Sequence, residues 1–141
     1  MNKWDERFLK LAEHVSGWSK DPSTKVGAVI TDQQNRVISV GYNGFPAGIA
    51  DTAERLNNRD EKLDLTIHAE ENALLFAQRP LNGCNLYVWP LPPCIKCAAK
   101  IVQTGIKRVI SPACKKEKWI ESCEKGRTIL TEARIIVIWH D

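Results

Sequence analysis

A histidine at position 68 and two cysteines at positions 94 and 97 place the strongest constraint on how this 141-residue chain can fold. One imidazole and two thiolates suit a tetrahedral Zn²⁺ ion, and three protein ligands leave its fourth position for a water molecule, as in catalytic zinc sites. Structural zinc sites are instead closed by four ligands. If His68, Cys94 and Cys97 bind one ion, two segments that are distant in sequence must meet at one point of the fold.

Both segments are predicted to open a helix. Residues 69–79 (AEENALLFAQR) contain strong helix formers, so His68 lies at the start of that helix. Cys94 and Cys97 are three residues apart, which places both sulfur atoms on one face of a second helix. The two prolines before Cys94 suit a helix start, because proline has no N–H to leave unpaired there. Helix N-termini and bound zinc both favour the thiolate, which is the form that binds metal.

Glu70 follows His68 by two residues. Residues two apart in a helix do not share a face, so we interpret Glu70 as a proton-transferring group beside the metal and not as a ligand. A lone histidine at a helix start is more often a cap or a core residue, and a lone Cys-x-x-Cys also occurs in redox pairs. The order His-x-Glu … Pro-Cys-x-x-Cys is, however, an established signature of zinc-dependent nucleobase deaminases. The combination therefore favours a zinc hydrolase.

The composition is that of an ordinary globular protein, with 43% hydrophobic and 26% charged residues. The net charge of +3 is too small to indicate a nucleic-acid-binding surface. No apolar run is long enough to span a membrane, and the N-terminus lacks the apolar core of a signal peptide. Five cysteines, an odd number, favour reduced thiols and a cytoplasmic location. We expect one domain over residues 1–141.

The hydrophobic pattern predicts an α/β fold with a mixed five-stranded sheet sandwiched by helices. The later strands alternate with helices, so they should run parallel through right-handed crossovers. The metal-binding helix starts then lie at the carboxyl ends of strands. Segment 51–65, with five acids and three bases, is interpreted as a partly helical surface excursion whose charge mainly serves solubility. Strands are expected at 26–31, 36–42, 84–89, 107–111 and 135–139, and further helices at about 4–18, from Cys94 to Gly105, and at 116–131.

Five segments carry a resemblance to a known family. The chain resembles the deoxycytidylate (dCMP) deaminases of the cytidine deaminase-like superfamily, in good register from about residue 18 to residue 105. The histidine, glutamate and cysteine motifs are shared across the superfamily, whereas the first two segments point to dCMP, because the tRNA adenosine-deaminating relatives lack the SKDP loop. The five segments are SKDPSTKVGAVI (19–30), GYNGFPAG (41–48), HAEENAL (68–74), LYVWPLPPCIKCA (86–98) and IVQTGIKRVI (101–110).

The resemblance implies a zinc-dependent hydrolytic deamination of dCMP to dUMP, with Glu70 as the proton shuttle. It implies zinc on His68, Cys94 and Cys97, and a cytosine nucleotide as the small-molecule substrate. It further implies a homo-oligomer, a hexamer in the members that dCTP activates and dTTP inhibits. The remaining residues that it implicates are Asn43 for the sugar, Ser19, Lys20 and Lys25 near the phosphate, Val26 and Ala69 in the pyrimidine pocket, and Gly41, Tyr42, Gly44 and Phe45 in the effector site.

The chain departs from the family in two places. Better-known members have a tyrosine after the fourth strand that helps to close the base pocket. Residues 111–119 (SPACKKEKW) contain none, so either Trp119 replaces it or the pocket is more open. Segment 51–67 has no cysteine or histidine, so we expect no second zinc there.

Three other functions remain open from the sequence. The first is deamination of another cytosine or modified-cytosine nucleotide, such as dCTP. The second is a catalytically silent zinc domain that binds nucleotides, although such a domain has no use for Glu70. The third is editing of single-stranded nucleic acid, which would require an aromatic and basic track along the surface.

Overall fold

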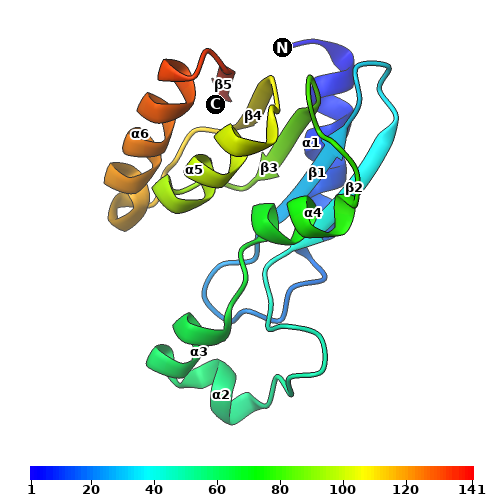
Figure 1. The fold of residues 1–141 in the computed structure, drawn as a ribbon. Helices are drawn as coiled ribbons and strands as arrows, with labels where there is room; N and C mark the ends of the chain where they lie inside the picture. The colour runs from blue at the N-terminus through cyan, green and yellow to red at the C-terminus, as the bar shows by residue number, and fades with distance from the viewer.

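Five strands form one mixed sheet in the order β2-β1-β3-β4-β5 (Figure 1). The computed structural model describes all residues from Met1 to Asp141. Strand β1 pairs antiparallel with both β2 and β3, whereas β3, β4 and β5 are parallel. The predicted parallel arrangement of the later strands is therefore confirmed, and β1 and β2 form an antiparallel hairpin. The strands span Gly27–Thr31 (β1), Val37–Tyr42 (β2), Asn85–Trp89 (β3), Arg108–Pro112 (β4) and Ile136–His140 (β5).

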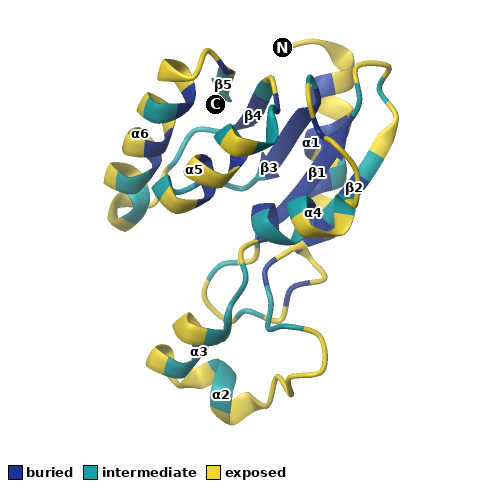
Figure 2. Cartoon of the chain, viewed as in Figure 1, coloured by how far each residue is buried: buried dark blue, intermediate teal, exposed yellow.

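Helices cover both faces of the sheet, as the sequence predicted. Helix α1 lies on one face, and α4, α5 and α6 lie on the other (Figure 1). Helices α2 and α3 form the predicted excursion and project beyond the sheet, where most of their residues are exposed or half-buried (Figure 2). The helices span Lys3–Ser16 (α1), Ala53–Asn57 (α2), Arg59–Leu65 (α3), Ala69–Ala77 (α4), Ile95–Thr104 (α5) and Glu117–Glu132 (α6).

The central strands are buried on both faces, which explains their almost continuous apolar sequences. Alternate residues of a strand point to opposite faces. Ile30 and Leu86 accordingly join the core beneath α4, α5 and α6, whereas Val29 and Tyr87 pack against α1. Burial of each such side chain contributes about 1.5–3 kcal/mol to folding. The first of these apolar layers packs α4 and α5, whose N-terminal ends carry the site, against the sheet.

Gly41 in β2 allows α4 to pack directly onto the backbone of the sheet. A Cβ atom at this position would lie 2.4 Å from the carbonyl oxygen of Ala69 and 2.5 Å from the amide nitrogen of Ala73. Any larger residue would therefore push α4 outward. Because Ala69 lies between His68 and Glu70, this close contact helps to set the position of both side chains.

A buried carboxylate, Asp5, ties α1 to the sheet. Tyr87 donates a hydrogen bond of 2.8 Å to one oxygen of Asp5, and Arg108 forms an ion pair of 2.9 Å with the other. Burial raises the pKa of Asp5, but the hydrogen bonds from Arg108 and Tyr87 outweigh this effect. The pKa of Asp5 therefore lies below its ordinary value of 3.8.

Replacing Asp5 by asparagine should lower the free energy of unfolding at pH 7 by about 1.5–3 kcal/mol, because a hydrogen-bonded charge is lost. A carboxylate whose pKa is depressed in the folded state stabilises the fold above its unfolded pKa, and this contribution disappears as the pH falls through the folded pKa. Urea unfolding of the wild type and of Asp5→Asn should therefore converge below pH ~4. A difference that stays constant to lower pH would contradict this role of Asp5.

The end of one predicted helix differs from the structure, and the end of another agrees with it. Helix α4 ends at Ala77, before the predicted residue 79, because Gln78 adopts a left-handed conformation with φ of 52°. Helix α5 ends as predicted at Gly105, which also has a positive φ of 80°. No helix in the structure combines the length and the apolar character needed to cross a membrane.

Candidate active site

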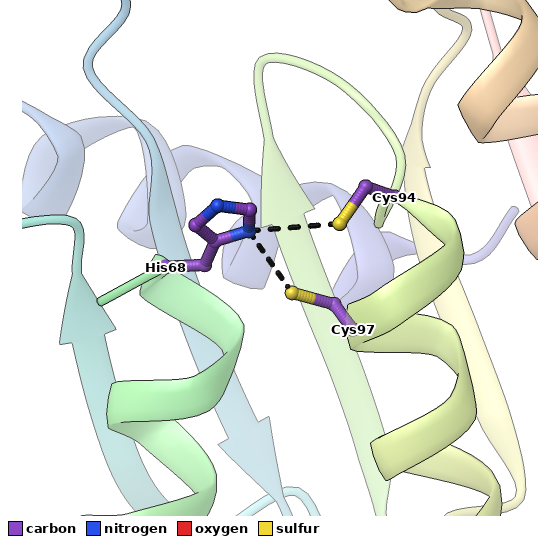
Figure 3. Close-up of side chains that lie close together, drawn as sticks. All are labelled: His68, Cys94 and Cys97. Atoms are coloured by element: carbon purple, nitrogen blue, oxygen red, sulfur yellow. Dashed lines mark hydrogen bonds between the residues drawn. The ribbon is translucent and has the colours of Figure 1, made fainter. Parts of the chain in front are cut away.

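His68, Cys94 and Cys97 meet between the starts of α4 and α5 (Figure 3). The Nδ1 atom of His68 lies 3.2 Å from Sγ of Cys97 and 3.6 Å from Sγ of Cys94. Zinc binds nitrogen at about 2.0–2.1 Å and thiolate sulfur at about 2.3 Å, so a tetrahedral ion places such donor atoms roughly 3.5–4 Å apart. The donor types fit one zinc ion, in the arrangement that the spacing predicted. The separation from Cys94 lies within this range, and the separation from Cys97 lies just below it.

The local charges favour the metal-binding form of Cys94. A hydrogen bond from Cys97 lowers the pKa of Cys94 to about 4, and a hydrogen bond from His68 acts in the same direction. Contact with Cys94 in turn raises the pKa of His68 to about 9. These two shifts favour the thiolate of Cys94, which is the form that binds zinc, and zinc binding would release the proton from His68.

An ion pair joins the helix that follows His68 to the helix that carries Cys97. One carboxylate oxygen of Glu71 accepts a hydrogen bond of 3.0 Å from the backbone N–H of His68. The other oxygen pairs with the ammonium group of Lys100, three residues after Cys97 in α5. This contact links α4 to α5 beside the donor cluster, although neither Glu71 nor Lys100 was singled out from the sequence.

Glu70 lies in the first turn of α4 and lines a cavity beside the donor cluster. Glu70 is only 4% exposed, and this burial raises the pKa of its carboxyl group from 4.5 to about 7. Glu70 is not part of the donor cluster itself. This placement agrees with the interpretation of Glu70 as a group that acts beside the metal.

The cavity next to the donor cluster collects residues from segments that are far apart in sequence. Val26, Asn43 and Ala69, which the resemblance implicated in substrate binding, lie there, and so does Trp119, the candidate replacement for the family's tyrosine. The half-buried Trp119 comes from the first turn of α6, and the ammonium of Lys118 lies 5.4 Å from the centre of its ring. The other lining residues are Asp21, Ser23, Thr24, Arg59, Lys62, Leu63, Thr66, His68, Glu70, Leu91, Pro92, Cys94 and Lys118.

Ser19, Lys20 and Lys25 do not line this cavity. Ser19 is buried, and its hydroxyl donates a hydrogen bond of 2.8 Å to the carbonyl oxygen of Asn43. Lys20 forms an exposed ion pair of 3.0 Å with Asp51, and Lys25 is exposed. The SKDPSTK loop reaches the cavity instead through its polar residues 21, 23 and 24.

The cationic side chains of the cavity are Arg59, Lys62 and Lys118. Arg59 and Lys62 belong to α3, in the segment whose charge we interpreted mainly as solubility. Their contribution corrects that interpretation, because part of the excursion forms a wall of the cavity. No motif or spacing marks these three residues in the sequence. The one available signal was that the excursion ends immediately before His68.

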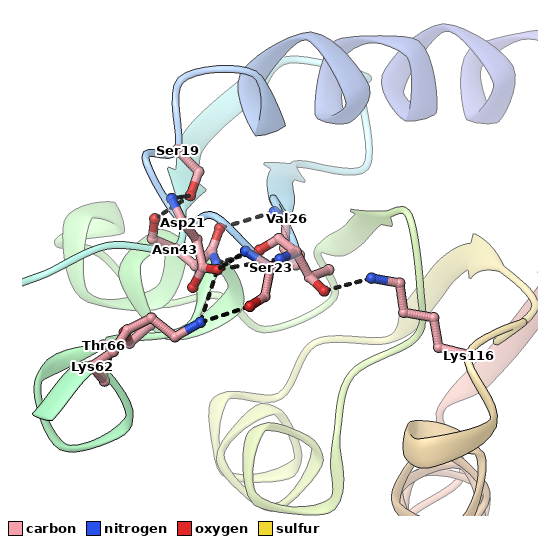
Figure 4. Close-up of polar contacts among 9 residues, drawn as sticks. Ser19, Asp21, Ser23, Val26, Asn43, Lys62, Thr66 and Lys116 are labelled. Atoms are coloured by element: carbon pink, nitrogen blue, oxygen red, sulfur yellow. Dashed lines mark hydrogen bonds and ion pairs between the residues drawn. The ribbon is translucent and has the colours of Figure 1, made fainter. Parts of the chain in front are cut away.

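Asn43 holds the SKDPSTK loop against the cavity (Figure 4). Its side-chain oxygen accepts a hydrogen bond of 2.9 Å from the backbone N–H of Val26, and its amide nitrogen donates one of 2.9 Å to the carbonyl oxygen of Thr24. A side-chain amide has two donor hydrogens and two acceptor lone pairs, so each end of Asn43 retains capacity for a ligand.

A second cavity lies beside the first and contains three of the four residues predicted for the effector site. Tyr42, Gly44 and Phe45 line it together with Trp18 and Lys20. Asp21, Asn43 and Thr66 line both cavities. Gly41 is not among the lining residues and is buried, and its tight packing against α4 gives it a structural role.

Comparison with known proteins agrees with the site. Residues 2–112 match a family described as the cytidine and deoxycytidylate deaminase zinc-binding region. A protein of Aliivibrio fischeri described as an uncharacterized deaminase in the luxG 3' region is 46% identical over 142 residues, which cover 99% of this chain and 95% of that protein. Human deoxycytidylate deaminase is 40% identical over 116 residues, which cover 77% of this chain but only 64% of the human protein.

A solved structure shares the fold over nearly the whole chain. The dCMP deaminase of cyanophage S-TIM5, in complex with dCMP and dUMP, is 25% identical with a TM-score of 0.77, and the match covers 97% of each chain. The predicted fold class and the predicted zinc cofactor are both confirmed. Because the family match, the relative of similar length and the shared fold all agree with the donor cluster, the chain belongs to the zinc-binding cytidine and deoxycytidylate deaminase family.

Proposed function

We propose that this protein hydrolyses dCMP to dUMP and ammonia. The observation that carries the proposal is a single cavity lined by two of the three metal donors, His68 and Cys94, by the buried carboxyl group of Glu70 and by three cationic side chains. A cytosine nucleotide has matching parts, namely an amine to be removed and an anionic phosphate. The relatives support the same substrate, since the human protein is a deoxycytidylate deaminase and the phage enzyme was solved with dCMP and dUMP.

The residues of the site have distinct roles in this reaction. A zinc ion held by His68, Cys94 and Cys97 would supply a water molecule with its pKa lowered to about 7. Glu70 takes a proton from this water and donates it to N3 of the cytosine ring while the hydroxyl group adds to C4. Glu70 then carries the hydroxyl proton to the exocyclic nitrogen, and ammonia leaves as the C4–N bond breaks. Glu70 therefore ends the cycle in the protonation state in which it began.

The apolar part of the cavity is suited to hold the base. Val26, Ala69 and Trp119 provide its hydrophobic surface beside Glu70. An aromatic ring adds both apolar contact area and a flat face for stacking. We therefore assign to Trp119 the closure of the base pocket that a tyrosine provides in better-known relatives, and to Asn43 a hydrogen bond to the sugar.

Arg59 and Lys118 are the two cavity cations that form no ion pair with a carboxylate, so we assign phosphate binding to them. Replacing either residue by methionine should lower kcat/KM for dCMP by roughly tenfold, the effect of losing one charge-assisted hydrogen bond of ~1.5 kcal/mol. Activity on deoxycytidine should hardly change, because this substrate has no phosphate. Steady-state kinetics with both substrates measures the effect.

The same kinetics on Lys20→Met and Lys25→Met tests the earlier prediction for the SKDPSTK loop. If these two variants lose dCMP activity while Arg59→Met and Lys118→Met do not, the phosphate belongs to the loop lysines instead. Effector binding at the second cavity and a homo-oligomeric state stay predictions from the family resemblance, and a cytoplasmic location stays a prediction from the cysteine content.

The substrate itself is tested by ammonia release from a panel of dCMP, deoxycytidine, CMP and dCTP. We expect dCMP to give the highest kcat/KM. A preference for dCTP would favour the alternative nucleotide activity, and ammonia release from none of the four by zinc-loaded protein would favour a silent nucleotide-binding domain.

A further inference from the structure

The two-helix excursion is anchored by a buried lysine. Helix α2 contains no buried residue, and the only buried residue of α3 is Lys62, which is 7% exposed. Burial of an ammonium group is costly unless the charge is paired. A hydrophobic residue would anchor the helix at lower cost, so the presence of lysine requires an explanation in its partners.

The partners of Lys62 lie in the SKDPSTK loop (Figure 4). Its ammonium group is 3.1 Å from a carboxylate oxygen of Asp21 and 3.1 Å from the hydroxyl of Ser23. The side chains of Lys62 and Asp21 are 9% and 11% exposed, so solvent screens the pair only weakly. The contact joins α3 to the SKDPSTK loop, and both segments contribute residues to the cavity wall.

Asp21 stabilises the conformation of the SKDPSTK loop through hydrogen bonds to its backbone. The oxygen that contacts Lys62 also accepts hydrogen bonds from the backbone N–H groups of Ser23, at 2.8 Å, and Thr24, at 3.2 Å. An aspartate commonly stabilises a turn in this way. Its cost is a negative charge in the wall of a cavity that, on the proposed function, must receive an anionic phosphate.

We propose that Lys62 determines specificity for phosphorylated substrates by neutralising Asp21. Without Lys62, Asp21 would repel the phosphate, although the phosphate itself contacts the other cavity cations. This inference rests on the proposed function. It assigns Lys62 a role that differs from that of Arg59 and Lys118, because its charge is already matched by a carboxylate of the protein.

The test compares ligands with and without phosphate in Lys62→Met. We expect the KM for dCMP and the Kd for dUMP to rise about tenfold, while the values for deoxycytidine and deoxyuridine change little. Adding Asp21→Asn to this variant should restore dUMP binding, since asparagine keeps an oxygen for the two loop N–H groups but carries no charge. Lys62→Arg should retain dUMP binding. Lys10→Met, an exposed substitution in α1, is the matched control.

Equal losses for phosphorylated and unphosphorylated ligands, with no recovery in the double variant, would overturn the proposal and leave Lys62 a purely structural anchor. No change in Lys62→Met would overturn it as well. The binding measurements do not depend on turnover, so they distinguish a failure of this inference from a failure of the proposed function. In the latter case wild-type protein would bind dUMP but release no ammonia from dCMP.

Discussion

Replacing Glu70 by glutamine is expected to lower kcat on dCMP by at least about 10²–10⁴-fold while the zinc content stays unchanged. Glutamine fills the same space in the buried wall of the cavity, but it cannot take a proton from water and return it to the substrate. Binding of dUMP should persist, because the base, sugar and phosphate contacts come from other residues. Elemental analysis, dUMP titration and steady-state kinetics on the same preparation measure these three quantities.

Glu121→Gln is a suitable control for this experiment. Glu121 lies on the exposed side of α6, where it pairs with Lys125 at 3.1 Å. Its substitution removes a surface carboxylate without touching the cavity, so activity should remain at the wild-type level. If Glu70→Gln instead loses zinc, Glu70 is a ligand, and the reaction has no proton carrier in this site.

Replacing Cys97 by alanine should reduce the bound zinc from about one ion per chain to a small fraction of that value. Only three donor atoms converge in the site, and Cys97 supplies one of them, so the variant keeps two ligands. Two protein ligands hold zinc far more weakly than three. Metal analysis after dialysis measures the loss, and circular dichroism checks that the sheet and helices remain folded.

Cys114→Ala provides the matched control, because Cys114 is a free, half-buried cysteine outside the donor cluster. We expect this variant to retain its zinc. Full zinc content in Cys97→Ala would contradict the ligand assignment, and equal loss in both cysteine variants would indicate a general effect on folding.

The donor cluster and the sheet could be predicted because their signals are local in sequence. The spacing of Cys94 and Cys97 determines which side of a helix their sulfur atoms face. Runs of β-branched residues predict strands wherever they occur, and Gly105 ends α5 through its own backbone preference. The separation of Glu70 from the metal donors likewise follows from helix geometry alone.

The cationic part of the cavity could not be predicted because it depends on packing between distant segments. Lys20 and Lys25 lie in the loop with the family signature, yet neither residue lines the cavity that this loop borders. Lys62 reaches the loop through a contact across 41 residues of sequence. Nothing in the charged segment 51–65 distinguishes this buried lysine from its solvent-exposed neighbours.

Gly41 illustrates the same limit for a single residue. It lies in a glycine-rich segment that the family resemblance connects with effector binding. In the structure, the absence of its side chain allows the backbone of α4 to approach the sheet. Whether a glycine serves a loop or a close contact depends on what packs against it, and this information is absent from the local sequence.

Hydrolysis of dCMP can be tested most directly by following the oxygen atom that replaces the amine. Zinc-loaded protein is incubated with dCMP in water enriched in ¹⁸O, and the nucleotides are analysed by mass spectrometry alongside an assay for ammonia. We predict dUMP that carries the heavy oxygen at ring C4, together with an equal amount of ammonia. Recovery of unchanged dCMP from protein that holds about one zinc ion per chain would contradict the proposed function.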